Sequence, residues 1–278
     1  MFTREDKSTI PGKGISPFTA IDAIPFTIPG IEKQLKIHKP TKASGPDQIS
    51  PWVFKNFAYQ CAIILAKIFQ QSYDSSCLPE DWKRAVVTPL YKKGDKSLPE
   101  NYKPIYLTCI ACKVMEHIVL SSMSKYLSEN NILTTHQHGF RKGYSTITQL
   151  ITVLDDWFSA LDKRKRTNGL LLDFAKAFDS VPHQRLLYKL HFYGIRNKTL
   201  YWIKSFLLGR SQRVQVNGAK SNWADVTSGV PQGTVLGPFL FILYINDIVD
   251  NLDSRIKLFA DDAVMYREIL SLQDEAIF

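Results

Sequence analysis

Two adjacent aspartates near the end of the chain, Asp261 and Asp262, have the side chains whose chemistry is easiest to interpret. They separate two alternating apolar runs, residues 256–259 and 263–266, which predict two short strands joined by a tight acidic turn. Adjacent carboxylates repel each other, and a divalent cation such as Mg²⁺ offsets this because it prefers carboxylate and phosphate oxygens. The simpler alternative is an ordinary solvated turn.

A third acid, Asp173, makes the metal interpretation stronger. It ends the apolar run 169–173, which predicts a strand in the interior of a sheet, where a lone carboxylate is costly. Three carboxylates at neighbouring strand ends suit two Mg²⁺ ions, with Mn²⁺ as the alternative, in a site for in-line phosphoryl transfer. We therefore expect Asp173, Asp261 and Asp262 to be metal ligands and catalytic residues.

Several segments resemble the motifs of reverse transcriptases, in the order of that family, and in particular its non-LTR retrotransposon branch and jockey-like group. The matching segments are residues 42–49, 101–105, 137–143, 171–179, 229–238 and 259–262. The resemblance covers roughly residues 31–270, and the second palm motif at 229–238 is the most specific part. It implies an RNA-directed DNA polymerase, a nucleotidyltransferase that acts in retrotransposition and adds dNTPs to a primer 3′-hydroxyl.

The resemblance also implies a fold. We expect an α/β (α+β) chain with the fingers and palm of a right-hand polymerase, in which a small antiparallel palm sheet packs on helices. Residues 1–30 are expected to form an extended arm or linker, 31–168 the fingers and N-terminal helices, and 169–278 the palm, with a fingers segment inserted at about 183–228. The thumb is expected to be absent, because the chain ends sixteen residues after Asp262, and no endonuclease domain is expected before the fingers.

The first palm motif implies further roles. Asp173 and Asp261 are expected to bridge the two metal ions most directly, and the main-chain carbonyl of Phe174 to be an extra ligand. Phe178 corresponds to the aromatic residue that packs beneath the nucleotide sugar and excludes a 2′-hydroxyl. An ordinary core phenylalanine is the alternative for Phe178.

The second palm motif and the fingers imply a nucleotide-binding site. Gln232 and Gly233 are expected beside the incoming nucleotide, although a purely structural turn is the alternative. Lys92, Lys93 and Lys103 are expected to bind the triphosphate. The family usually has Arg at position 103, and Lys lacks the planar fork of Arg that suits phosphate.

Three consecutive residues, Phe140, Arg141 and Lys142, are expected to contact the template, with a solvated basic loop as the alternative. A second departure from the family is Tyr106, which stands where Ser is usual. Both departures favour a second hypothesis, a truncated or domesticated inactive copy that binds nucleic acid without catalysis. A viral RNA-dependent RNA polymerase is a third hypothesis, and the bulky Phe178 argues against it.

Composition fits these hypotheses. The 278 residues carry a net charge of +9, which favours a polyanionic partner, here an RNA template with a DNA primer. The longest apolar run, 239–245, is too short to span a bilayer, so we infer no membrane association. The sequence identifies no protein partner. Four cysteines without a disulfide pattern indicate an intracellular location, in the nucleus, the cytoplasm or both. Cys109 and Cys112 have zinc-like spacing but are expected to pack in the core.

Periodicity predicts the elements that position these residues. Helices are expected at 31–37, 53–73, 112–129, 146–162, 183–192 and 198–208, and from the second motif toward 248. Strands are expected at 85–91, 212–217 and 223–227, with a hairpin at Asn217-Gly218, and a basic loop at 162–168. Phe57 and Ile68 are placed on the buried face of the helix at 53–73, and Asp179 is expected to cap the helix at 183.

Overall fold

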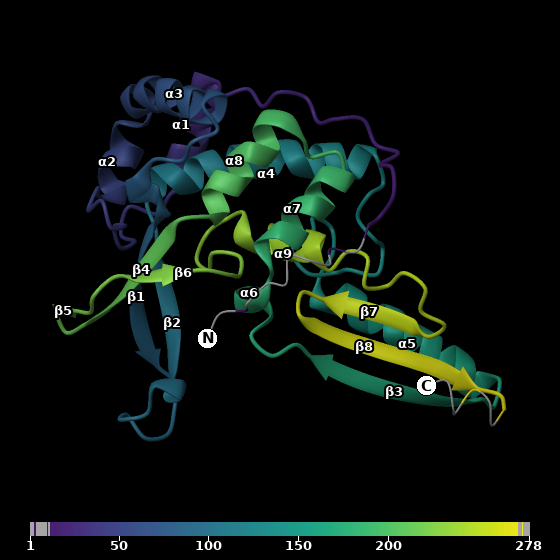
Figure 1. The fold of residues 1–278 in the computed structure, drawn as a ribbon. Helices are drawn as coiled ribbons and strands as arrows, with labels where there is room; N and C mark the ends of the chain where they lie inside the picture. The colour runs from purple at the N-terminus through teal and green to yellow at the C-terminus, as the bar shows by residue number, and fades with distance from the viewer. Residues whose placement is uncertain (1–2, 4–9, 11, 272–273, 275–278) are drawn as a thin grey trace.

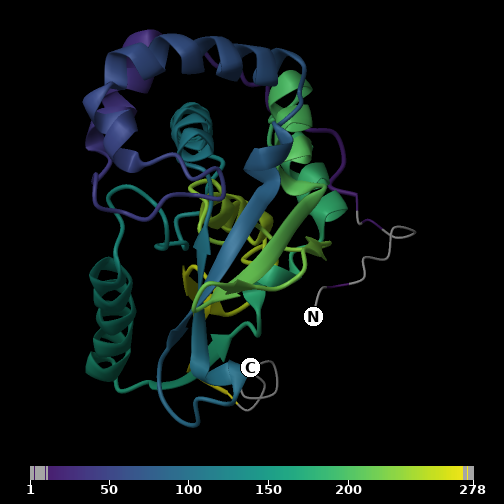
Figure 2. The same ribbon diagram turned by 90° about the vertical axis from the view of Figure 1, so that its left-hand side faces the viewer.

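Helices and two separate sheets make up the chain. The computed structural model describes every residue except 1–2, 4–9, 11, 272–273 and 275–278. Most helices gather on one side of the molecule and both sheets extend from the other (Figure 1), an arrangement that is also visible in the turned view of Figure 2. This mixed α/β arrangement confirms the predicted fold class in its broad form.

The N-terminal helices are α1 (Ile28–Ile37), α2 (Pro51–Asn56) and α3 (Ala58–Asp74). The single helix predicted for 53–73 is therefore wrong, because the backbone at Phe57 (φ −112°, ψ 36°) leaves the helical region. Phe57 is 48% exposed and Ile68 37% exposed, so their predicted place on the buried face is also wrong. The break turns α2 away from α3, and Phe69 becomes the fully buried aromatic of α3.

The larger sheet combines segments that are far apart in the sequence. Its strands are β1 (Arg84–Tyr91), β2 (Tyr102–Leu107), β4 (Arg210–Val216), β5 (Ala219–Lys220) and β6 (Ala224–Val226), in the order β2-β1-β4-β5 with β6 also on β4. The turn at Asn217-Gly218 is confirmed, with positive φ at both residues. The return strand predicted at 223–227 is β6, which pairs antiparallel with β4, and β5 is an additional short strand directly after the turn.

Four central helices contribute many of the buried residues of the core. They are α4 (Ile110–Glu129), α7 (His183–Phe192), α8 (Asn197–Leu207) and α9 (Gly237–Tyr244). Helix α9 ends before the predicted 248, and α7 begins after Pro182 without a side-chain cap, so the prediction for Asp179 is wrong. Cys109 and Cys112 are buried as predicted, and burial raises the pKa of the Cys109 thiol to about 12.

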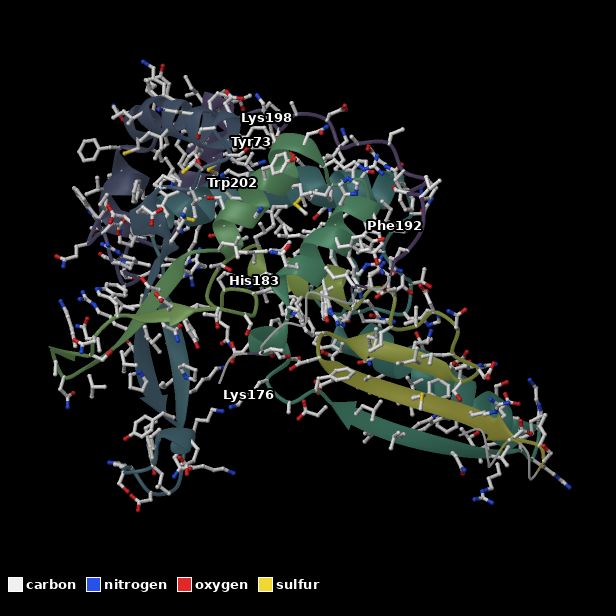
Figure 3. All side chains as sticks on the ribbon, in the orientation of Figure 1. Tyr73, Lys176, His183, Phe192, Lys198 and Trp202 are labelled. Atoms are coloured by element: carbon white, nitrogen blue, oxygen red, sulfur yellow. The ribbon has the colours of Figure 1, made fainter. Side chains whose placement is uncertain are left out.

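Polar contacts join α3 to α8 inside this helical layer (Figure 3). The Tyr73 hydroxyl lies 2.7 Å from the Thr199 hydroxyl, and the indole N–H of Trp202 donates to Ser72 Oγ at 3.1 Å. Because both bonds are buried, they fix the register of the two helices. None of the helices in the described part of the chain is long and apolar enough to cross a membrane.

The smaller sheet is antiparallel and carries the acidic residues. Its strands are β3 (Arg166–Asp173), β7 (Arg255–Phe259) and β8 (Asp262–Ile269), in the order β3-β8-β7, and α5 (Thr146–Asp162) lies across its back (Figure 1). The short elements are η1 (Glu80–Lys83), η2 (Pro99–Asn101) and α6 (Ala177–Ser180). The loop predicted at 162–168 ends earlier, since β3 begins at Arg166.

Strand β3 does not lie in a sheet interior, contrary to the prediction. It is one of the two edge strands of the smaller sheet, and Leu171 is 78% exposed. The continuous apolar run suggested burial on both faces, but only β8 pairs with β3 among the described residues. Asp173 is consequently also exposed, which lowers the cost of a carboxylate at this position.

Candidate active site

The β7–β8 hairpin brings the three acids to one end of the smaller sheet. Phe259 pairs with Asp262, which leaves Ala260 and Asp261 as a two-residue turn. Asp173 is the register partner of Asp262 across β3 and β8. We call residues 259–262 the acidic turn. Tertiary pairing thus places Asp173 directly beside the acidic turn, although it is 89 positions upstream of its partner Asp262 in the sequence.

Electrostatics at this end of the sheet are unfavourable. Asp173 and Asp262 are directly opposite each other on paired strands. Like charges in this arrangement are destabilising. Burial raises the pKa of the Asp261 carboxyl, and the charges of Asp262 and then Asp173 raise it further. Such a cluster is costly to fold unless a cation or a substrate compensates it.

The donor set fits a hard divalent cation, because carboxylate oxygens are the ligands that Mg²⁺ prefers. The carbonyl of Phe174 accepts a hydrogen bond from the Ala177 amide at 3.2 Å and keeps a second lone pair. Among the residues that the structure describes, however, no three His, Cys, Asp or Glu side chains are close enough to form a preassembled metal site. The backbone brings the acids together, and metal binding would require their side chains to turn toward one another.

The second motif is attached to the segment that follows β3. The Gly229 amide donates to Val181 O at 2.9 Å, and the Val230 amide donates to Phe178 O at 2.8 Å. Gly229 has φ +88°, and a Cβ there would lie 2.7 Å from Asp179 Cα, so the close approach requires glycine. These bonds connect the second motif to the end of β3 and therefore to the acidic residues.

Gln232 and Gly233 lie where the larger sheet meets this segment. Gln232 Nε2 donates to Asp179 Oδ1 at 2.8 Å, so the amide that was predicted to contact a nucleotide is hydrogen-bonded within the protein. Gly233 has φ +75°, and a Cβ there would lie 2.6 Å from Tyr106 O. Burial, with a contribution from Asp179, raises the pKa of Tyr106. Asp179 and Tyr106 are thus neighbours that the sequence did not indicate.

A cavity of about 210 Å³ lies beside these residues. Its lining includes Tyr106, Asp179, Gln232, Arg210, Ser211 and Val226. Polar groups from the larger sheet and from the second motif both face it. The cavity is therefore a hollow between the two parts of the molecule, with hydrogen-bonding groups on either side.

Phe178 lies in a set of packed aromatic rings. It stacks on Phe241 with ring centroids 4.4 Å apart, and it meets Phe140 edge-on at 6.2 Å. The ring is half-buried. Packing therefore fixes its orientation, and it connects the segment after β3 both to α9 and to the loop that carries Phe140.

The lysines predicted to bind triphosphate are brought together on one hairpin. Lys103 on β2 lies opposite Leu90 on β1, and the Lys92 amide donates to Asn101 O at 2.9 Å. Lys92, Lys93 and Lys103 are all exposed. Their charges therefore face solvent along the β1–β2 hairpin.

The predicted template-binding residues have unequal environments. Phe140 is 54% exposed with φ +54°, and Lys142 is exposed. The Arg141 guanidinium instead donates to the carbonyls of Thr134 and Gln137 and lies 4.4 Å from the centre of the Tyr144 ring. Arg141 therefore holds its own loop, and a contact with template phosphate would compete with these bonds.

One buried carboxyl near the second motif was not identified from the sequence. Glu116 on α4 is fully buried, and its Oε2 accepts hydrogen bonds from the Val235 and Leu236 amides at 2.6 and 2.9 Å. Burial raises the pKa of Glu116. A signal did exist, because Glu116 is the only acid on the face of α4 that carries Cys112, Val119 and Met123.

Comparison with known proteins identifies relatives. The family described as "Reverse transcriptase (RNA-dependent DNA polymerase)" matches residues 91–274. The chain is 32% identical over 239 residues to the probable RNA-directed DNA polymerase from transposon X-element, and 31% identical over 241 residues to the RNA-directed DNA polymerase from mobile element jockey, both from Drosophila melanogaster. These matches cover 81% and 83% of this chain.

A third relative, the probable RNA-directed DNA polymerase from transposon BS of the same organism, is 28% identical over 87% of this chain. The chain spans only 26% to 28% of the length of these three relatives. The likeness therefore concerns one domain of much longer proteins.

Proposed function

The chain belongs to the reverse transcriptase family, as a domain of the non-LTR retrotransposon type, and from this premise we propose that it is an RNA-directed DNA polymerase domain. It would add dNTPs to a primer 3′-hydroxyl on an RNA template during retrotransposition. The observation that carries the proposal is the convergence of Asp173, Asp261 and Asp262 at one end of the smaller sheet. The second motif, attached to the end of β3, lies next to them.

Asp173, Asp261, Asp262 and the Phe174 carbonyl would hold two divalent ions, Mg²⁺ or Mn²⁺. When bound, such ions lower the pKa of an attacking hydroxyl and stabilise the charge on the leaving pyrophosphate. The protein contributes the positions: paired strands keep Asp173 and Asp262 opposite each other, and the turn places Asp261 at the tip. The exposed lysines of the β1–β2 hairpin would bind the triphosphate.

The architecture supports a division into fingers and palm. We propose 31–168 as fingers, 169–278 as palm, and about 183–228 as a fingers segment inserted in the palm. The parallel pairing of β1 with β4 agrees with this insertion, because it joins the larger sheet across these segments. Strand β3 begins at Arg166, so the structural start of the smaller sheet lies just before the proposed boundary. The RNA template, DNA primer and dNTPs are the partners.

Primer extension tests the proposal. The chain is incubated with Mg²⁺, dNTPs and an RNA template annealed to a DNA primer, and binding of the same duplex is measured in parallel. Extension supports the polymerase. Binding of the duplex without any extension, at saturating protein, would instead support the inactive copy that binds nucleic acid without catalysis.

Replacement of Lys103 by Arg is expected to lower the KM for dNTP about fivefold. A planar guanidinium can bind phosphate in a bidentate manner, which corresponds to roughly 1 kcal/mol for one additional charge-assisted hydrogen bond. Steady-state kinetics measures the effect, with Lys67→Arg on the exposed side of α3 as the matched control. An unchanged or raised KM for Lys103→Arg would contradict the proposed triphosphate contact.

Replacement of Phe178 by Ala is expected to reduce the discrimination against rNTPs by about tenfold or more, since the ring would no longer exclude a 2′-hydroxyl. The readout is the ratio of kcat/KM for a dNTP to that for the matching rNTP. Phe178→Tyr keeps the ring and is the control that should retain discrimination. If Phe178→Ala stays folded and its ratio is unchanged, the stack on Phe241 is the only role of this residue.

A further inference from the structure

Gln137 is a buried amide that contacts the acidic turn from outside its hairpin. It is only 2% exposed. Its Oε1 accepts hydrogen bonds from the Ala260 amide at 2.9 Å and from the Gly139 amide at 2.7 Å. Its Nε2 donates to Ala260 O at 3.5 Å. One side chain thus bonds to both the N–H and the carbonyl of Ala260.

The backbone on either side of Gln137 is joined to the strand that leads into the turn. The His138 amide donates to Leu258 O at 2.8 Å, and the Leu258 amide donates to His136 O at 2.9 Å. Gly139 follows, and a Cβ there would lie 2.4 Å from the Ala260 amide nitrogen, so only glycine allows this approach. The segment 136–139 therefore contacts both the strand that leads into the turn, at Leu258, and the turn itself, at Ala260.

Ala260 is the residue of the turn that needs support. It has φ +55°, a left-handed conformation that is unfavourable for a residue with a Cβ. The β7–β8 ladder ends at Phe259 and Asp262, so the Ala260 amide lies beyond it. Ala260 is only 6% exposed, and a buried amide without a partner is costly. Gln137 supplies that partner.

We propose that Gln137 is a positioning residue for the acidic turn: its amide holds Ala260 in the left-handed conformation and thereby sets the direction of Asp261 and Asp262. This inference rests on the proposed polymerase function, in which both carboxylates must face the reacting phosphates. The rest of the hairpin is secured independently, because Leu258 and Ala263 are buried in the core and β8 pairs with β3 over its length. Loss of the amide should therefore loosen the turn without unfolding the sheet.

The first test replaces Gln137 by Met, which has a similar length and no amide. We expect kcat to fall about tenfold or more, because small misplacements of reacting groups are expensive, while binding of primer-template stays within twofold. Gln149→Met is the matched control, since Gln149 is also buried and its Nε2 donates to Lys257 O on β7 at 3.3 Å, away from the turn. Equal losses of kcat in both variants would overturn the proposal.

A conservative variant tests whether the hydrogen-bond acceptor alone restores activity. Gln137→Glu keeps an oxygen that can accept from the Ala260 and Gly139 amides. It is expected to retain more of kcat than Gln137→Met, although it adds a negative charge near the acidic residues. If Glu is no better than Met, acceptance of these two hydrogen bonds is not the role of the residue.

A readout without catalysis separates this inference from the proposed function. Hydrogen exchange of the peptide that contains Ala260 and Asp261 should become faster in Gln137→Met, with exchange in α4 and α8 unchanged. Unchanged exchange at the turn would overturn the inference even in an active enzyme. Faster exchange in a chain that shows no primer extension would support the positioning role and reject only the polymerase activity.

Discussion

Asp173→Asn and Asp261→Asn are each expected to lower primer extension at least about a thousandfold while leaving the chain as stable as the parent or more stable. Each substitution removes a ligand charge from the site, and metal ions at phosphoryl-transfer sites supply several kcal/mol of transition-state stabilisation. The expectation for stability comes from the fold, since Asp173 lies directly opposite Asp262 on paired strands. Removal of one charge from such a pair relieves repulsion.

The raised pKa of Asp261 supports the same expectation for stability, because burial and two neighbouring acids disfavour its charged form. An Asn at this position has no charge to desolvate. Loss of activity together with preserved or increased stability is the pattern expected of residues retained for chemistry. A purely structural aspartate would show the opposite pattern, with stability lost on substitution.

Two measurements check this prediction. Single-turnover primer extension gives the loss of rate, with Asp253→Asn, an exposed acid just before β7, as the control. Thermal unfolding with and without MgCl₂ gives the second readout, because an ion that binds only the folded state raises Tm. The parent and Asp253→Asn should gain stability from MgCl₂, and the site variants should gain clearly less. Extension within tenfold of the parent in Asp173→Asn would contradict the proposed metal site.

The second large effect concerns stability. Glu116→Ala is expected to destabilise the chain by about 3 kcal/mol or more, because the amides of Val235 and Leu236 both donate to Glu116 Oε2 and would lose their partner. Each buried donor left unsatisfied costs about 1–3 kcal/mol. Leu236 is fully buried, so water cannot easily replace the carboxyl. Val235 and Leu236 lie within the second motif, between Gly233 and the start of α9 at Gly237, so this motif should also become less ordered.

Glu116→Gln is the matched control, since its side-chain oxygen can still accept from both amides. Burial raises the pKa of Glu116 above its ordinary value of 4.5. The stability that this carboxyl contributes is therefore fully present below pH 4.5 and is lost as pH rises through the folded-state pKa. The difference in stability between the parent and Glu116→Gln should accordingly shift in favour of Gln as pH rises.

Denaturant unfolding at several pH values measures both effects. Glu116→Ala should show a lower midpoint with an unchanged slope, and the advantage of Glu116→Gln over the parent should grow with pH. A Glu116→Ala variant within 1 kcal/mol of the parent would mean that other groups satisfy the two amides. A difference between Gln and parent that does not change with pH would mean that Glu116 is not protonated more readily in the folded state.

Sequence alone determined the features that depend only on residues close to one another along the chain. Helices α5 (146–162) and α7 (183–192) have the predicted bounds, because amphipathic spacing is a local property. The turn at Asn217-Gly218 was also predictable, since these residues tolerate positive φ. The motifs likewise sufficed to recognise the family, and they named Asp173, Asp261 and Asp262 before any geometry was known. The roles of these residues stay predictions.

Tertiary structure decided which distant residues meet. An apolar run cannot show whether its strand is central or at an edge, so the exposure of Leu171 on β3 was missed. The bonds of Glu116 to Val235 and of Gln137 to Ala260 join residues 119 and 123 positions apart. Spacing along the chain carries no information about such pairs, because packing of helices and sheets brings them together. The sequence therefore placed the acids in recognisable motifs, but only the tertiary structure showed that Gln137 bonds to the turn that carries Asp261.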